Sequence, residues 1–219
     1  MIAEIENQLK DFAKKELQTE GLTFEFVKDL GGAFSNKLKR IKLPLYDEID
    51  EEKMDVLKCL LTHEVCHLDF SDFDYEFDEK TPGLLLPSLI IEDIVVERNM
   101  VEKNAHVCGY LKKLNNNYVY KYFIKNKDYS SMNVDDLCLR KFFTMFSRTD
   151  HCPMTIIRYA VSNDKKEKAQ EKFEKLRKFI PEAFNLETRP RTTKTSEDLA
   201  RKVLEFFGDF EKPSYYFGK

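Results

Sequence analysis

The sequence Leu-Leu-Thr-His-Glu-Val-Cys-His-Leu occupies residues 60–68 and combines apolar, helix-forming residues with two histidines. His63 and His67 are four residues apart, so on an α-helix they are separated by only about 40° and their imidazoles leave one face. Two imidazoles arranged in this way can bind one Zn²⁺ together. The stretch therefore predicts a helix that carries two ligands of a metal site.

Glu64 follows the first of these histidines and lies on the flank of the same helix face. From there a carboxylate can accept a proton from a metal-bound water and pass it on. The chain has only four histidines, so a chance occurrence of this pattern is rare. The alternative is two partly exposed histidines on an ordinary helix.

The segments around the motif indicate an α+β fold that is mostly helical. The acidic residues 50–52 favour the start of the motif helix, which is expected to run to about Phe70. Apolar spacing predicts further helices over residues 2–18 and about 85–104, and the acidic, aromatic residues 71–83 between the motif helix and the next indicate a loop.

Two β-rich segments, residues 22–30 and 37–46, precede the motif helix. Residues 31–36 between them contain two glycines and indicate a turn, so we expect a small β-hairpin or sheet. Pro44 has no backbone N–H to donate, which predicts that the second strand lies at a sheet edge.

The remainder of the chain gives weaker, mostly helical signals. We expect residues 1–104 to form a metal-binding core, and residues 105–219 to form a helical, basic half packed on that core as one domain. Ser196 is expected to cap the last helix. The expected helices of this half cover residues 134–147, 153–162, 164–179 and 196–207, with residues 186–194 as a linker.

Residues 89–98 of the second predicted helix contain three acidic residues, Glu92, Asp93 and Glu97. At about 100° per residue, Asp93 and Glu97 lie in the apolar face, whereas Glu92 falls on the polar side. An unpaired carboxylate in an apolar face costs on the order of several kcal/mol. A metal and its histidines would compensate both acids, one as the third ligand and the other as the hydrogen-bond partner of an imidazole. The alternative is pairing with basic residues elsewhere.

His-Glu-x-x-His followed by an acid-bearing helix resembles the gluzincin clan of zinc metallopeptidases. In that clan the third ligand is a Glu, and an acid four residues on supports a ligand histidine. The string Glu92-Asp93-x-x-x-Glu97 also resembles the Glu-Asp-x-Arg-x-Glu motif of HExxH proteins in phage and bacterial genomes. The resemblance covers about residues 22–104 and implies a zincin-like fold, bound Zn²⁺ and peptide hydrolysis with Glu64 as the general base.

The sequence departs from these patterns in three places. The clan's Glu-x-x-x-Asp order appears as Asp93-x-x-x-Glu97, so the two roles can be exchanged, and Glu92 stays open as a third ligand. Val95 stands where the related motif has Arg. Phe73 occupies the place of the third His of the metzincins, so that extension is absent.

A His or Tyr that steadies the oxyanion is also implied by the resemblance to the gluzincins. His106, Tyr110, Tyr118 and His151 are candidates, and the alternative for each is a surface or hydrogen-bonded role. Cys66 lies between the two ligand histidines, but its direction is off their face by roughly 60°. We expect it to be a packed core thiol.

The net charge of −3 conceals an asymmetry. Residues 1–104 carry 13 Lys and Arg against 24 Asp and Glu, a net of −11, and residues 105–219 carry 23 against 15, a net of +8. The basic half can meet a protein partner, or its charges can simply face water and the acidic half. Residues 165–178 are basic but carry few aromatics and no nucleic-acid motif, which disfavours nucleic-acid binding.

The five cysteines are odd in number and form no CxxC pair, which is typical of a reducing cytosol. No apolar run is long enough to span a membrane, and residues 1–6 lack a secretory signal. We therefore expect a cytoplasmic protein.

Two functions follow as hypotheses. The first is a zinc metalloendopeptidase that acts on a peptide or protein substrate, held extended along the strand at residues 39–46. The second is a non-catalytic, zinc-stabilised binding or assembly protein of phage or bacterial origin.

Overall fold

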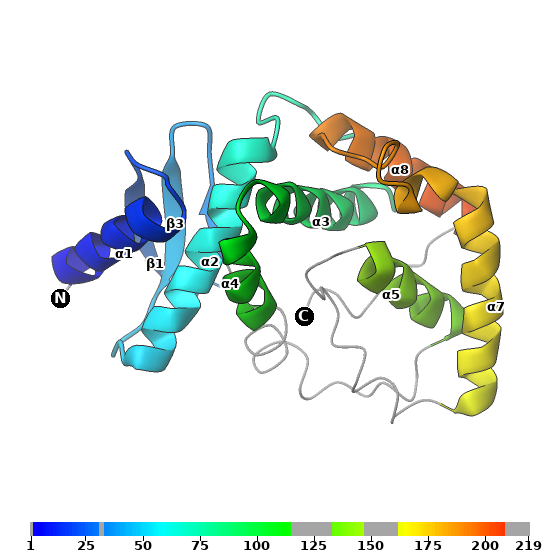
Figure 1. The fold of residues 1–219 in the computed structure, drawn as a ribbon, viewed down its shortest axis with the longest axis horizontal. Helices are drawn as coiled ribbons and strands as arrows, with labels where there is room; N and C mark the ends of the chain where they lie inside the picture. The colour runs from blue at the N-terminus through cyan, green and yellow to red at the C-terminus, as the bar shows by residue number, and fades with distance from the viewer. Residues whose placement is uncertain (1, 31–32, 115–132, 147–161, 209–219) are drawn as a thin grey trace.

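A computed structural model of the chain describes residues 2–30, 33–114, 133–146 and 162–208. The fold is mixed α+β, with a small sheet and α1 at one end and α5, α7 and α8 at the other (Figure 1). The elements in chain order are α1 Ile2–Glu16, β1 Thr23–Lys28, β2 Phe34–Ser35, β3 Arg40–Leu45, α2 Glu51–Phe70, α3 Leu85–Lys103, η1 Ala105–Val107, α4 Cys108–Lys113, α5 Val134–Phe146, α7 Asn163–Phe179, η4 Pro181–Phe184 and α8 Thr193–Phe207.

The α+β class expected from the sequence is therefore confirmed. The motif helix is α2, and the acid-bearing helix that follows it is α3. The expected loop over 71–83 joins them and contains no helix or strand. The helix expected over 153–162 lies outside the described residues.

The sheet has the strand order β1-β3-β2, and the predicted hairpin between residues 22–30 and 37–46 is wrong. Strand β1 runs parallel to β3 along its whole length, whereas the short β2 is the antiparallel neighbour of β3. The tight turn lies after β2 and is formed by Asn36, whose Oδ1 accepts hydrogen bonds from the backbone N–H groups of Leu38 (3.0 Å) and Arg40 (3.3 Å). A side chain that mimics a backbone turn in this way replaces the glycine pair on which the prediction relied.

Strand β3 is the central strand, so the prediction that Pro44 marks a sheet edge is also wrong. Pro44 is tolerated because β2 pairs only with Ile41 and Lys42 and ends before the proline. Since β2 occupies that part of β3, it also covers the first half of the strand expected to hold an extended substrate.

Helix α2 is capped by Asp50, whose side chain accepts a hydrogen bond from the backbone N–H of Lys53 (2.8 Å). Such a cap satisfies one of the free N–H groups of the first turn. Leu57, Leu61 and Val65 recur every four residues and are completely buried. They form part of a core with α1 and the sheet, here called the sheet-side core.

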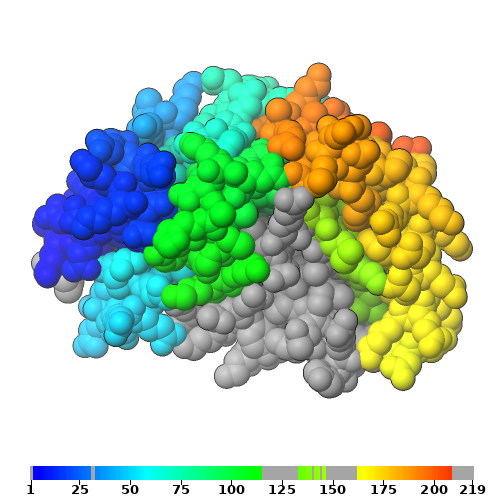
Figure 2. Space-filling view, viewed as in Figure 1, coloured from blue at the N-terminus to red at the C-terminus, as the bar shows by residue number. Residues whose placement is uncertain are grey.

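A second core, here called the helical core, is formed by buried side chains of α3, α5, α7 and α8. Helix α3 belongs to both cores, because Ile91 and Val95 lie in the helical core whereas Val96 and Met100 lie in the sheet-side core. Figures 1 and 2 show α3 between the two ends of the molecule, with the N-terminal elements at one end and α7 at the other. The predicted division at residue 104 stays a prediction.

Residues 186–194 do not form the linker predicted for them, since they are bound to α3. The Arg98 guanidinium donates to the Pro190 carbonyl, and Asn99 Nδ2 donates to the Arg191 carbonyl at 2.9 Å. Glu102 forms ion pairs with both Arg189 and Arg191. Arg98 and Asn99 are both buried under this segment.

Helix α8 begins one turn earlier than predicted. Thr192 caps it in a capping box with Thr195, whereas Ser196 lies buried inside the first turn and donates to the Thr192 carbonyl (2.9 Å). The prediction of Ser196 as the cap is therefore wrong, because two neighbouring threonines offered the same chemistry earlier in the chain.

None of the described helices is both long and apolar enough to cross a lipid bilayer. The four cysteines within the described residues, Cys59, Cys66, Cys108 and Cys138, are free thiols.

Candidate metal centre

The two motif histidines lie in the last two turns of α2 and face α3. His63, His67 and Asp93 each offer one ligand atom, and these three atoms lie within 4.8 Å of one another. The imidazole rings are 4.9 Å apart between centroids and are inclined by 79°. Two imidazoles and one carboxylate form the donor set of a catalytic zinc site, which takes three protein ligands and leaves one position open.

Glu97 lies behind the first histidine. Its Oε1 is 2.8 Å from His63 Nδ1, and its side chain is only 1% exposed. Because the hydrogen bond occupies Nδ1, the other ring nitrogen of His63 remains for a metal. Glu97 was predicted either to bind the metal or to support a histidine, and its position matches the supporting role.

His67 has two contacts of its own. Its Nδ1 is 2.8 Å from Ser71 Oγ, and its Nε2 is 3.2 Å from Asp93 Oδ1. The Asp93 side chain is 40% exposed, unlike Glu97, so the two acids do not share the buried face on which the sequence placed them. Asp93 is the acid that shares the cluster with both histidines.

Glu92, the remaining candidate for the third ligand, is not part of the cluster. Its carboxylate accepts a hydrogen bond from Thr193 Oγ1 on α8 at 2.9 Å, and it is 6% exposed. The predicted polar side of α3 is in fact covered by α8 and by residues 186–194.

Glu64 is buried, with 4% of its surface exposed. No hydrogen bond or ion pair joins its carboxylate to another side chain in the described part of the chain, yet its charge is close enough to raise the pKa of His63. The Glu64 oxygens are not among the enclosed polar atoms that lack a hydrogen-bond partner, so water can still reach the carboxylate although most of the residue is covered.

Cys66 lies between the histidines in sequence but points into the core. Its thiol donates to the Thr62 carbonyl at 3.1 Å and is completely buried. Burial, together with the charges of Glu97 and Asp69, raises the pKa of the thiol well above its usual value. This burial confirms the prediction of a packed core thiol. A neutral, buried thiol is also a poor metal ligand.

The cluster is strongly anionic. Burial lowers the pKa of His63, but its hydrogen bond to Glu97 and the charges of Asp93, Glu97 and Glu64 outweigh this effect and raise the pKa to about 10. Without a metal, the imidazolium form of His63 therefore serves as the cation among these carboxylates. A divalent cation would replace that proton, because zinc binds neutral imidazole.

The other candidates lie elsewhere or outside the described residues. His106 is exposed and its Nε2 is 2.7 Å from Glu16 Oε2, and Tyr110 packs edge-on against Phe12 at 4.9 Å between ring centroids. His106 therefore has the surface role given as the alternative, whereas Tyr110 has a packing role. Tyr118 and His151 lie outside the described residues.

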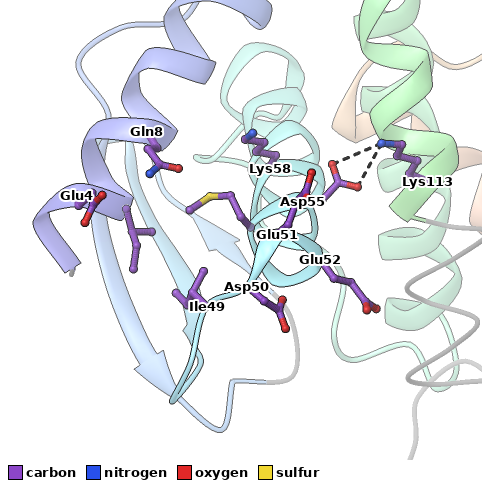
Figure 3. Close-up of a pocket in the computed structure, with 11 residues that line it drawn as sticks. Glu4, Gln8, Ile49, Asp50, Glu51, Glu52, Asp55, Lys58 and Lys113 are labelled. Carbon is purple, nitrogen blue, oxygen red and sulfur yellow. Dashed lines mark hydrogen bonds and ion pairs between the residues drawn. The ribbon is translucent and has the colours of Figure 1, made fainter.

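A cavity of about 830 Å³ lies at the opposite end of α2 from the histidine cluster (Figure 3). It is rich in acids, and on its rim Lys113 Nζ pairs with Asp55 Oδ2 at 3.2 Å. Its other labelled residues include Glu4, Asp50, Glu51, Glu52 and Lys58. The cavity contains none of the histidines.

Two residues that contact the cluster or its neighbours, Ser71 and Thr193, were missed in the sequence. Ser71 continues the four-residue spacing of His63 and His67, so an extended helical projection would have found it. Thr193 gave no such signal, because it is more than a hundred residues away from its partners Glu92 and Asp72.

The donor set, the supporting hydrogen bonds and the surrounding negative charge all fit a zinc ion. Comparison of the chain with protein-family models, with curated proteins and with solved structures finds no match.

Proposed function

We propose that the protein is a zinc-dependent peptidase in which His63, His67 and Asp93 hold the metal and Glu64 is the general base. The observation that carries the proposal is the convergence of these three ligands from two helices, with their ligand atoms within 4.8 Å. The substrate class comes from the resemblance to the gluzincins.

The supporting contacts hold the ligands in one orientation. Glu97 accepts a hydrogen bond from His63 Nδ1, and Ser71 Oγ pairs with His67 Nδ1, both at 2.8 Å. Hydrogen bonds of this kind fix the ring tautomer and raise the basicity of the nitrogen that faces the metal. The partly exposed Asp93 side chain leaves the cluster accessible to solvent on one side.

Zinc bound here would lower the pKa of a water to about 7 and polarise the carbonyl of the scissile peptide bond. Glu64 would accept a proton from the attacking water as its oxygen bonds to the carbonyl carbon, and would then donate that proton to the leaving amine as the C–N bond breaks. A general base in this position contributes roughly 10²–10⁴-fold to the rate.

The test is Glu64→Gln, which keeps the size of the side chain and removes the base. Zinc content is measured by elemental analysis, and cleavage of an unfolded polypeptide is measured by mass spectrometry. Glu51→Gln is the matched control, because it lies on the same helix but is exposed. We expect Glu64→Gln to retain zinc and to lose at least about 100-fold in rate, while the control keeps both.

Cleavage retained in Glu64→Gln would contradict the assigned mechanism. A wild-type protein that binds zinc but cleaves no polypeptide would instead favour the non-catalytic, zinc-stabilised binding or assembly protein.

A further inference from the structure

Three residues on one face of α8 contact the segment that joins the two metal-bearing helices. Thr193, Glu197 and Arg201 are spaced four residues apart, so their side chains lie in one stripe along the helix. Residues 71–83, here called the connecting segment, follow α2 directly and lead into α3. Figure 1 shows α8 beside the N-terminal end of α3, which this segment enters.

Thr193 holds two parts of the site together through one hydroxyl group. Its Oγ1 donates to Glu92 Oε1 on α3 at 2.9 Å and accepts from the backbone N–H of Asp72 at 2.8 Å. Thr193 is 2% exposed. Its hydrogen bond to Glu92 is buried, whereas the one to Asp72 is only partly buried. Within the described residues, this hydroxyl is the hydrogen-bond donor to the buried Glu92 carboxylate.

Glu197 and Arg201 hold the connecting segment further along. Glu197 Oε2 accepts from the backbone N–H of Asp78 at 2.9 Å. Arg201 pairs with Asp78 Oδ2 at 2.8 Å and with Glu197 Oε1 at 2.6 Å. The pKa of Asp78 is lowered by its hydrogen bonds to Thr81 and Arg201, so this contact is ionic at neutral pH.

The contact at Asp72 is one residue away from a residue that supports the metal cluster. Ser71, whose Oγ is 2.8 Å from His67 Nδ1, immediately precedes Asp72. Asp93, the carboxylate of the cluster, immediately follows Glu92 in α3. Thr193 therefore fixes the backbone next to the partner of His67 and, at the same time, the residue before the third ligand.

We propose that Thr193 is a positioning residue for the metal site, supported by Glu197 and Arg201 on the same face of α8. It sets the distance between the end of α2 and the middle of α3, and thereby the geometry of His67 and Asp93. The inference rests on the proposed metal site and assigns to α8 of the basic half a role in building that site.

The test compares Thr193→Val with Thr193→Ser in the full-length chain. Valine keeps the shape but removes the donor and the acceptor, whereas serine keeps both. Lys202→Ala is the matched control, because Lys202 lies on α8 but pairs with Glu182, away from the connecting segment. Co²⁺ affinity is measured by competition with a chelator, at a temperature at which every variant is folded, and amide hydrogen exchange of residues 71–83 is measured without metal.

We expect Thr193→Val to weaken Co²⁺ binding by about tenfold or more, as is common for residues that support metal ligands. Exchange in residues 71–83 should become faster in the same variant. Thr193→Ser should stay within about twofold of wild type, and Lys202→Ala should be unchanged in both measurements. If Thr193→Val does not fold, Arg201→Gln, a more exposed change on the same face, should show the same pattern with a smaller loss.

Wild-type affinity in a folded Thr193→Val protein would overturn the positioning role and leave the proposed function standing. Equal losses in Thr193→Val and Thr193→Ser would also overturn it, because serine retains the hydroxyl. A wild-type protein that binds neither Co²⁺ nor Zn²⁺ would overturn the proposed function itself.

Discussion

The sheet-side core and the helical core hold different parts of the candidate metal centre. The sheet-side core fixes α2, and therefore the two histidines, through Leu57, Leu61 and Val65. The helical core fixes α8 and its Thr193 stripe through residues such as Leu199 and Val203. Only α3 belongs to both cores among the described helices, and it carries the acids of the site. The cluster is therefore assembled between two cores rather than within one.

The largest effect is expected from cutting a large side chain out of either core. Leu61→Ala and Leu199→Ala should each lower the free energy of unfolding by about 2–5 kcal/mol, because each leaves a cavity in a closely packed region. If α3 couples the cores, chemical denaturation followed by circular dichroism should show one transition in both variants. Two separate transitions would show that the cores unfold independently.

The next prediction distinguishes the roles of Asp93 and Glu97 on α3. Glu97→Gln should weaken zinc binding by about 10–100-fold, because it removes the charged partner of His63. Asp93→Asn should weaken it more, because it removes a ligand. Zinc affinity is measured by chelator competition, with Glu51→Gln, an exposed acid at the start of α2, as a control. A larger loss in Glu97→Gln would show that the two roles are exchanged.

The contact between His63 on α2 and Glu97 on α3 should also make the stability of the metal-free protein depend on pH. The folded-state pKa of His63 is raised to about 10, so its contribution to stability is fully present below pH 6.5 and is lost as the pH rises toward 10. The slope is at most about 1.4 kcal/mol per pH unit. Urea denaturation of the metal-free protein at several pH values measures how the free energy of unfolding changes with pH.

His63→Asn is the control for this titration and should show a flatter profile over the same range. Zinc affinity should change in the opposite direction and increase with pH, because zinc must displace the proton. A metal-free protein that becomes more stable from pH 7 to 10 would contradict the assignment.

The smallest effect is expected at the other anchor of the connecting segment. Lys37, in the turn after β2, pairs with Asp74 at 2.7 Å, but both side chains are largely exposed. Lys37→Ala should therefore change stability by at most about 1 kcal/mol and leave zinc affinity unchanged. A loss of affinity as large as that of Thr193→Val would show that the sheet side, and not α8, positions the segment.

The parts of the fold and the site that depend on local pattern could be predicted from the sequence. Helices α2 and α3, the loop between them and the facing of His63 and His67 all follow from spacing along the chain. Glu97 and Asp93 could be singled out, but their roles could not be assigned, because helix projection gives a direction and no distance to a partner.

The parts that depend on distant contacts could not be predicted. The parallel pairing of β1 and β3 and the central place of Pro44 follow from strand order, which no local signal encodes. Residues 186–194 were expected to be a linker because they are polar, yet α3 supplies their partners from about ninety residues earlier. Thr193 was missed for the same reason.

Metal analysis of the protein, purified without added metal, tests the central claim most directly. We expect one zinc per chain in the wild type and its loss in His63→Ala, while His106→Ala, a histidine outside the cluster, keeps it. A wild-type protein that contains no zinc and takes none up when it is supplied, or a His63→Ala protein that retains the metal, would contradict the account.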